Sequence, residues 1–248
     1  MVSMICHIGV IVCGGRGKRL KNLTKKTQKC LLKVANIPII MYVIKALIVA
    51  GCKDIYFITG YKSFQIEKYF GDGKKYGFIA HYINPNAKGT AQALSSLADD
   101  IKEPFVYSHG NIIYNLSLVK NLLRFHQKGS IATLALAIKD LGRTHAYALV
   151  DDSRVVDLEI PGLTTVSGNG FCCMGVSVFT PEIFEYLIKV RPSGMVEEGV
   201  KAAIKDGKVV RGYKYRYDWF HLQIPQDFYS LEGLNIRKII GGGFSNFF

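Results

Sequence analysis

The chain has 248 residues, and 32 Lys and Arg against 19 Asp and Glu give it a formal net charge of +13. Hydrophobic residues make up 49% of the sequence and charged residues 21%, which is typical of a globular protein and excludes a disordered one. The sequence has neither an apolar run long enough to span a bilayer nor the pattern of a signal peptide. The positive charge predicts an anionic partner, which is nucleic acid, a membrane surface or a phosphorylated small molecule.

Six cysteines are spread along the chain without a CxxC pair, so the spacing typical of zinc sites is absent. Two of them, Cys172 and Cys173, are adjacent. We interpret all six as reduced thiols, and we therefore expect a cytoplasmic protein.

The first half of the sequence alternates strand and helix patterns. A β-branched run at 8–13 is typical of a strand buried on both faces, and residues 20–35 read as a loop. Pro38 and Gly51 enclose a helix at 39–50. The elements expected next are strands at 54–59, 78–83 and 105–108 and helices at 63–70, 91–99 and 116–128. This alternation predicts an α/β protein with a doubly wound, mostly parallel sheet, which binds ligands at the carboxyl ends of its strands.

The second half is richer in strands. We expect an antiparallel meander of strands at 131–138, 146–150 and 155–158. The elements expected after it are strands at 175–179 and 209–217 and helices at 181–189 and 196–206. Because no linker divides the chain, we predict one domain over 1–240, with lobes at about 1–130 and 131–240, followed by a flexible tail at 241–248.

A glycine-rich basic turn, Gly14–Arg19, follows the first strand. Glycines let backbone N–H groups approach an anion closely, and basic side chains add charge. The turn is not a P-loop, because no Gly-Lys-Ser/Thr closes it, and Leu20 stands where a dinucleotide motif has its third glycine. Taken alone, the turn is as well interpreted as a tight connection with surface arginines.

Several segments in chain order form a longer pattern. They read VCGGRGKRLKNLTKKTQKCLL at 12–32, VANIPII at 34–40, TGYK at 59–62, YFGDG at 69–73, GTAQAL at 89–94 and PQDF at 225–228. From residue 8 to about 230 this pattern resembles the sugar-1-phosphate nucleotidylyltransferases, whose signature is GGxGTRL, LT, PK and LLPVxxxPLI, with later GTAxAL and TPEDL motifs. The residues that match the signature are Gly14, Gly15, Gly17, Arg19, Leu20, Leu23, Thr24, Lys29, Leu31, Leu32, Val34 and Pro38.

The resemblance implies a Rossmann-like core with an antiparallel sugar-binding lobe. It also implies a reaction in which an NTP and a sugar 1-phosphate give an NDP-sugar and pyrophosphate. Arg19 and Lys29 fall at the family's catalytic positions, which contact the triphosphate and stabilise the transition state. The positions around the nucleotide are Gly14, Gly15, Arg16, Gly17, Lys18, Gly60, Gly89, Thr90 and Gln92.

The sequence departs from the family where the metal is bound. The family's Asn-Gly-Asp, whose carboxylate binds Mg²⁺, is His109-Gly110-Asn111 here, and the second metal-binding Asp falls at His221. An amide is a poorer ligand for a hard cation than a carboxylate, and imidazole suits transition metals better than Mg²⁺. The resemblance implies Mg²⁺ or Mn²⁺ as cofactor, but Asn111 and His221 predict a weakened metal site.

The sugar lobe departs as well. The family's Glu-Lys-Pro, whose Lys holds the sugar phosphate, is Glu159-Ile160-Pro161 here. Two further sugar-binding positions fall at Ala146 and Cys173, where the family has Gly and Asn. The base and the acceptor therefore stay open.

Three functions remain at this point. The first is an active nucleotidylyltransferase with a weakened metal site, and the second is an impaired relative that binds nucleotide or NDP-sugar as a regulatory or structural subunit. The third is a nucleic-acid-binding protein, for which the basic and aromatic stretch 213–217 is the one suggestive segment. We interpret that stretch as a strand with one solvated side. We therefore expect an NTP and a sugar 1-phosphate as partners, neither nucleic acid nor membrane, and a core that allows a homodimer.

Overall fold

The computed structural model describes residues 6–138, 145–167, 169–232 and 234–242. These residues form two units. The β1 unit, named after strand β1 (Ile8–Val12), consists of His7–Pro85, Ser108–Lys120 and the described residues from Tyr217 onward. The β8 unit, named after strand β8 (Ser130–Ala137), consists of Cys6 and the described residues of Asn86–Tyr107 and Asn121–Arg216.

The chain passes from one unit to the other more than once. It does so before residue 7, after Pro85, within strand β6 (Phe105–His109), within helix α5 (Leu118–Phe125) and after Arg216. The single domain with lobes at 1–130 and 131–240 stays a prediction. Of the tail expected at 241–248, residues 243–248 lie outside the described part of the chain.

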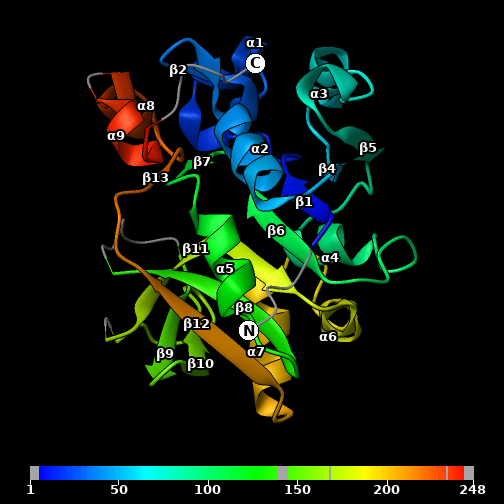
Figure 1. The fold of residues 1–248 in the computed structure, drawn as a ribbon, viewed down its shortest axis with the longest axis vertical. Coiled ribbons are helices and arrows are strands. Elements are labelled where there is room, and N and C mark those ends of the chain that lie inside the picture. The colour runs from blue at the N-terminus through cyan, green and yellow to red at the C-terminus, as the bar shows by residue number, and fades with distance from the viewer. Residues whose placement is uncertain (1–5, 139–144, 168, 233, 243–248) are drawn as a thin grey trace. The chain divides into compact units, whose positions relative to one another are not determined.

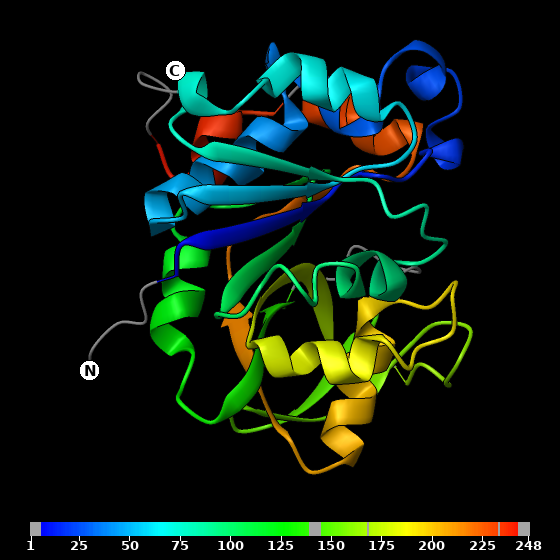
Figure 2. The ribbon, with the colours of Figure 1, turned by 90° about the vertical axis from the view of Figure 1, so that its right-hand side faces the viewer.

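Parallel strands form the sheet of the β1 unit. Strand β4 (Asp54–Ile58) lies between β1 and β5 (Ile79–Ile83), and both pairings are parallel (Figure 2). The first four residues of β1 are buried, which confirms a strand covered on both faces. Helix α2 (Ile39–Ala50) has the predicted bounds because Gly51, at φ 105°, ends it in a conformation that glycine adopts easily. Helix α3 (Ser63–Phe70) also has the predicted bounds.

The segment predicted as a loop at 20–35 contains regular structure, so that prediction was wrong in detail. Within it and at its two ends lie short helical turns and a small hairpin, namely η1 (Lys18–Leu20), α1 (Leu23–Lys26), η2 (Lys29–Leu31), β2 (Lys33–Val34) and β3 (Ile37–Pro38). Two side chains at the start of α3 hold these turns in place. Lys62 Nζ donates to the Thr24 carbonyl oxygen at 3.2 Å, and Gln65 Nε2 donates to the Lys26 carbonyl oxygen at 2.9 Å. The basic loop is therefore anchored to its neighbours in the β1 unit.

A hydrophobic cluster packs the C-terminal helices of the β1 unit against α2. Helices α8 (Pro225–Glu232) and α9 (Ile236–Ile240) lie side by side in Figure 1. The short strands β7 (Ile112–Ile113) and β13 (Phe220–His221) pair beside them. The buried members of this cluster are Leu20, Leu32, Val34, Ile39, Tyr42, Ile113, Leu222, Leu231, Ile236, Ile239 and Ile240. Leu20 and Leu222 thus fix two chain segments whose neighbours carry the predicted site residues.

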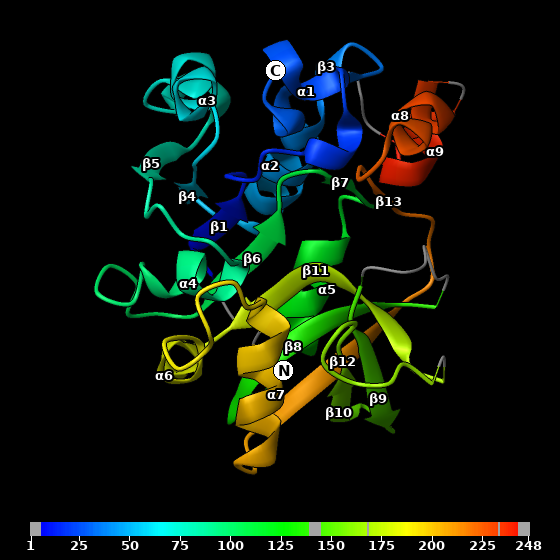
Figure 3. The ribbon, with the colours of Figure 1, turned by 180° about the vertical axis from the view of Figure 1, so that it is seen from behind.

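The β8 unit has a mixed sheet whose order differs from the predicted meander. In the described part of the chain, β8 pairs antiparallel with β11 (Phe171–Phe179) and parallel with β12 (Val209–Tyr215), and it does not pair with β9 (Tyr147–Asp151). Strand β9 instead forms an antiparallel hairpin with β10 (Arg154–Glu159), as Figure 3 shows. Every residue of β8 is buried, which suits an interior strand flanked on both sides.

The remaining predicted helices are shorter than expected. They are observed as α4 (Thr90–Ser95), η4 (Pro181–Ile183) followed by α6 (Phe184–Leu187), and α7 (Val196–Lys205). The helical turn η3 (Lys74–Tyr76) lies where no helix was predicted. None of the described helices is both long enough and apolar enough to cross a membrane.

Candidate active site

The loops that follow β1 and β4 touch through two glycines. The Tyr61 N–H donates to the Gly14 carbonyl oxygen at 2.9 Å. A Cβ on Gly14 would lie 2.8 Å from the Thr59 carbonyl oxygen, and a Cβ on Gly60 would lie 2.8 Å from the Gly14 carbonyl oxygen. Real Cβ atoms do not approach backbone this closely, so both positions need glycine. The two predicted nucleotide-binding glycines are therefore brought together.

The turn itself is shaped by Gly17, whose φ of 62° lies in the left-handed region. Its carbonyl oxygen accepts the Leu20 N–H at 2.9 Å and the Thr24 hydroxyl at 3.2 Å. These bonds hold η1, which carries Lys18 and Arg19. The exposed Arg16 instead lies over the ring of Tyr61, with its guanidinium carbon 5.6 Å from the ring centre.

Lys29 is placed by the residue before it. The Gln28 side chain is fully buried, donates to the Cys13 carbonyl oxygen, and accepts the Cys30 N–H at 2.5 Å. Lys29 Nζ then lies 3.5 Å from the point where a Cβ on Gly15 would sit. Gln28 was not predicted as a site residue, although the sequence holds a signal for it, because Gln stands here where the PK motif has Pro.

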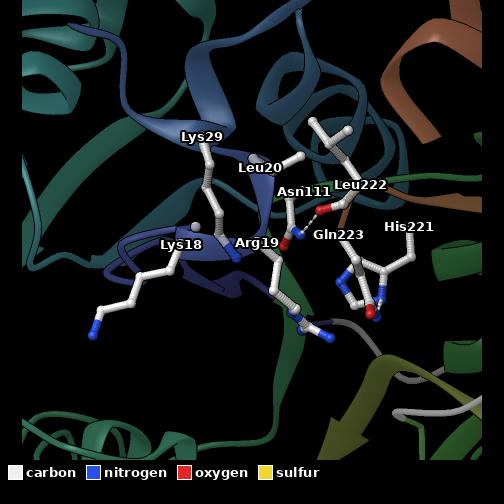
Figure 4. Close-up of a pocket in the computed structure, with 9 residues that line it drawn as sticks. Lys18, Arg19, Leu20, Lys29, Asn111, His221, Leu222 and Gln223 are labelled. Carbon is white, nitrogen blue, oxygen red and sulfur yellow. Dashed lines mark hydrogen bonds between the residues drawn. The ribbon is translucent and has the colours of Figure 1, made fainter. Parts of the chain in front are cut away.

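A pocket of about 190 Å³ lies within the β1 unit (Figure 4). It is lined by Gly17, Lys18, Arg19, Leu20, Lys29, Asn111, His221, Leu222 and Gln223. The structure thus brings the two predicted catalytic residues together with the two predicted metal positions. In Figure 4 the ammonium group of Lys18 points away from the other side chains. Leu222 and Gln223 were missed because the long-range pairing that places them leaves no local sequence signal.

Asn111 is buried, with 2% of its surface exposed, and it is bonded twice to Leu222. Its side-chain Nδ2 donates to the Leu222 carbonyl oxygen at 2.7 Å. The Leu222 N–H donates to the Asn111 carbonyl oxygen at 2.9 Å. Because a backbone carbonyl only accepts, the NH₂ group of the amide has to face Leu222.

His221 is held by its own segment. Gln223 Nε2 lies 2.9 Å from His221 Nδ1, and because an amide nitrogen only donates, Nδ1 is the acceptor. The carboxylate of Asp227 accepts the N–H groups of Gln223 and Ile224 at 2.7 and 2.8 Å. This carboxylate is therefore used to fix the turn that carries Gln223.

The other predicted nucleotide-binding residues lie at the start of α4, in the β8 unit. A Cβ on Gly89 would lie 2.3 Å from the Gly194 carbonyl oxygen, so this position also needs glycine. The Thr90 hydroxyl oxygen accepts the Val196 N–H at 3.0 Å. Gln92 is exposed, and its side-chain oxygen accepts the Lys88 N–H at 3.1 Å.

The three predicted sugar-binding positions are neighbours in the same unit. The Cys173 N–H donates to the Ala146 carbonyl oxygen at 2.8 Å, and Glu159 pairs with Tyr147, the residue after Ala146. The carboxylate of Glu159 already accepts the Ser167 N–H at 3.0 Å and the Ser167 hydroxyl at 2.7 Å. The structure therefore brings these positions together, with Glu159 bonded to its own loop.

A second, small cavity in the β8 unit has a volume of about 10 Å³, room for one water molecule. Cys173 lines it together with Tyr107 and Glu197, neither of which the sequence analysis named. Burial raises the pKa of the Glu197 carboxyl group. Burial, followed by the nearby Glu197 charge, also raises the pKa values of Cys173 and Tyr107. The thiol of Cys173 is thus a neutral group at physiological pH.

Comparison with known sequences identifies the chain. The sequence model of the nucleotidyl transferase family matches residues 8–229. The chain belongs to this nucleotidyl transferase family. It is 28% identical over 226 residues to a low-salt glycan biosynthesis nucleotidyltransferase of Haloferax volcanii, which covers 88% of this chain and 63% of that protein. It is 30% identical over 203 residues to a glucose-1-phosphate thymidylyltransferase of Streptomyces antibioticus, which covers 79% of this chain and 56% of that protein.

Solved structures agree on the fold. The inositol-1-phosphate CTP transferase of T. maritima matches with a TM-score of 0.79 at 18% identity, over 96% of this chain and 99% of that one. This member of the nucleotidyl transferase family therefore has the predicted Rossmann-like fold of the nucleotide-diphospho-sugar transferases, and the resemblance seen in the sequence is confirmed. The chain spans less than two thirds of the length of the two curated relatives.

The metal implied by the resemblance does not fit the donors of this family member. Mg²⁺ prefers charged oxygen ligands, and none of the described residues that line the pocket is Asp or Glu. The Asn111 amide and the His221 ring are each engaged by a neighbour, Leu222 and Gln223. Among the described residues, no group of three or more His, Cys, Asp or Glu is arranged to hold a metal ion.

Proposed function

We propose that this nucleotidyl transferase moves a nucleoside monophosphate from an NTP to a sugar 1-phosphate, or to a similar phosphorylated acceptor, and releases pyrophosphate. The observation that carries the proposal is the pocket beside the turn that follows β1, which is lined both by Arg19 of the glycine-rich turn and by Lys29 of η2. A strand end of this kind is where α/β sheets bind phosphates. The relative named as a glucose-1-phosphate thymidylyltransferase supports the class of acceptor.

In the proposed reaction, a phosphate oxygen of the acceptor attacks the α-phosphorus of the NTP. The bond from the α-phosphorus to the oxygen bridging the β-phosphate breaks, and pyrophosphate leaves with the electron pair. Two polyanions have to meet, and negative charge grows on the leaving group. Arg19 and Lys29 offset the repulsion and stabilise that charge. The backbone N–H groups of residues 14–17 contact the phosphates.

Further roles follow from the same proposal. Gly89, Thr90 and Gln92 border the base, while Ala146, Glu159 and Cys173 border the acceptor. We also propose a cytoplasmic enzyme, with homodimer formation to be measured by light scattering on the purified chain.

A pyrophosphate-release assay tests the proposal. The full chain is incubated with each common NTP and a panel of sugar 1-phosphates, and the NDP-sugar is identified by mass. We expect one combination to turn over, and Arg19→Ala or Lys29→Ala to lower kcat/KM by about 100-fold. Lys33→Ala is the matched control, because Lys33 is an exposed lysine near the loop that does not line the pocket. Absence of release in every combination, with NTP binding retained, would support the impaired relative instead.

A further inference from the structure

The charge of the pocket is unusual for a site that receives a metal-bound polyphosphate. Of its nine lining residues, Lys18, Arg19 and Lys29 carry positive charge, and the described lining includes no carboxylate. A divalent cation brought into such a pocket is repelled by the cations and meets no anionic ligand from the protein. A bare polyphosphate is attracted by the same side chains.

Position 111 is built for an amide. The Nδ2 group of Asn111 donates to the Leu222 carbonyl oxygen at 2.7 Å, and only 2% of the surface of Asn111 is exposed. A carboxylate at this position would place one oxygen against the Leu222 carbonyl oxygen without a proton between them. Burying two acceptors against each other is costly. The amide that stands at position 111 in place of the family's carboxylate therefore suits the Leu222 carbonyl oxygen, which needs a donor.

The polar side chains of the segment 221–227, which faces Asn111, likewise bond to other groups of the protein. Gln223 Nε2 contacts His221 Nδ1 at 2.9 Å, so this ring nitrogen is engaged by a side chain of the protein itself. The carboxylate of Asp227, six residues after His221, accepts hydrogen bonds from two backbone N–H groups. The charged side chains that line the pocket, Lys18, Arg19 and Lys29, are all cations and favour an anion.

We infer that this pocket receives its polyphosphate as a metal-free anion, with Arg19 and Lys29 supplying the positive charge that a divalent cation supplies elsewhere. The inference rests on the proposed function only in taking the polyphosphate to be that of an NTP. It concerns binding, so it can hold or fail independently of turnover.

Calorimetry with inorganic tripolyphosphate tests the inference, because this probe has no base. The full chain is titrated once in EDTA and once with excess Mg²⁺. We expect saturable binding in EDTA that Mg²⁺ weakens, since the Mg²⁺ complex carries less negative charge. Arg19→Ala and Lys29→Ala should each weaken binding in EDTA by about 10-fold or more, and Lys33→Ala should leave it unchanged.

Each other outcome is decisive. Binding that requires Mg²⁺, or that Mg²⁺ strengthens, overturns the inference and leaves the proposed transferase standing. Binding in EDTA without turnover of any NTP supports the inference and removes the proposed function. Absence of binding under both conditions overturns the inference alone, because turnover of an NTP is measured separately by pyrophosphate release. A titration of Mn²⁺ into the chain alone gives a second readout, for which we expect no saturable heat.

Discussion

The side-chain amide of Gln28 donates a hydrogen bond to the carbonyl oxygen of Cys13, the residue that follows β1. The oxygen of the same amide accepts the Cys30 N–H, and the Gln28 N–H donates to the Gln65 side chain at 2.7 Å. One fully buried side chain thus ties the strand end to the residues on both sides of Lys29. We regard Gln28 as a positioning residue for the Lys29 ammonium group.

Removing that side chain should affect stability and binding together. Gln28→Ala leaves the Cys13 carbonyl and the Cys30 N–H without this partner, and we expect the free energy of unfolding to fall by about 2–3 kcal/mol. Affinity for tripolyphosphate should fall because Lys29 loses its place. Urea denaturation and calorimetry measure the two effects. If Gln28 acts through Lys29, the double variant that combines Gln28→Ala with Lys29→Ala loses less binding free energy than the sum of the losses in the two single variants. Additive losses would refute the positioning role.

Asn111→Asp should not restore a metal site. At pH 7 the new carboxylate faces the Leu222 carbonyl oxygen, and we expect the variant to lose about 1–3 kcal/mol of unfolding free energy. Because the carboxylate is unfavourable in the folded state, its pKa there is raised above the ordinary value of about 4, so the deficit relative to the wild type should shrink as the pH falls toward 4 and the protonated group donates to Leu222, with no further change below pH 4. Thermal denaturation of both proteins between pH 7 and about pH 4 measures this deficit in stability. A gain of Mg²⁺-dependent turnover in Asn111→Asp would contradict the expectation.

Two predicted nucleotide-binding glycines should respond differently to alanine. A Cβ on Gly89 meets the Gly194 carbonyl oxygen at 2.3 Å, so Gly89→Ala requires a backbone shift that we expect to cost about 1–3 kcal/mol. A Cβ on Gly15 lies at an ordinary 3.5 Å from Lys29 Nζ. Gly15→Ala is therefore the matched control, with a Tm near that of the wild type. Equal Tm values for the two variants would argue against a steric need for glycine at position 89.

The buried Cys30 thiol should make stability fall at alkaline pH. Burial raises the pKa of this thiol to about 11 from its ordinary 9.0, and Lys29 nearby offsets part of the shift. Below pH 9 the folded and unfolded states both keep the proton, so the contribution is complete. Between pH 9 and 11 the unfolded state loses the proton first, and the unfolding free energy decreases.

The size of this effect follows from the shift. Relative to Cys30→Ala, which lacks the group, the wild type should lose about 2 kcal/mol between pH 8 and 10.5. Urea denaturation of both proteins at the two pH values gives the difference directly. A difference that stays constant with pH would mean that Cys30 does not titrate as described.

Local signals in the sequence predicted some elements well. Helix 39–50 was bounded correctly because Pro38 and Gly51 act on their own residues, whatever the rest of the chain does. The order of strands was not predictable in the same way. The apolar pattern of β8 (Ser130–Ala137) indicates a buried strand. Its pairing with β11 and β12 depends on long-range packing, which the local pattern does not encode. The predicted meander of this strand with β9 was therefore wrong.

The residues of the candidate site also differ in whether a local signal in the sequence identifies them. Arg19 and Lys29 were named because they lie in a continuous motif. Gln223 and Leu222 lie far away in the chain, and the pairing of β13 with β7 brings them to Asn111. A reading of one sequence position at a time therefore finds the missing carboxylate at 111. It does not find the carbonyl oxygen that makes an amide necessary there.

The bond between Asn111 and Leu222 has an evolutionary consequence. Asn and Asp codons differ by one nucleotide, so a mutation that places a carboxylate at position 111 arises readily. In this fold that mutation meets a backbone oxygen rather than a metal, and selection for a stable protein removes it before a second change at position 221 can make it useful. The first step toward the family's type of metal site is thus one mutation away in the gene and separated by a stability barrier in the protein.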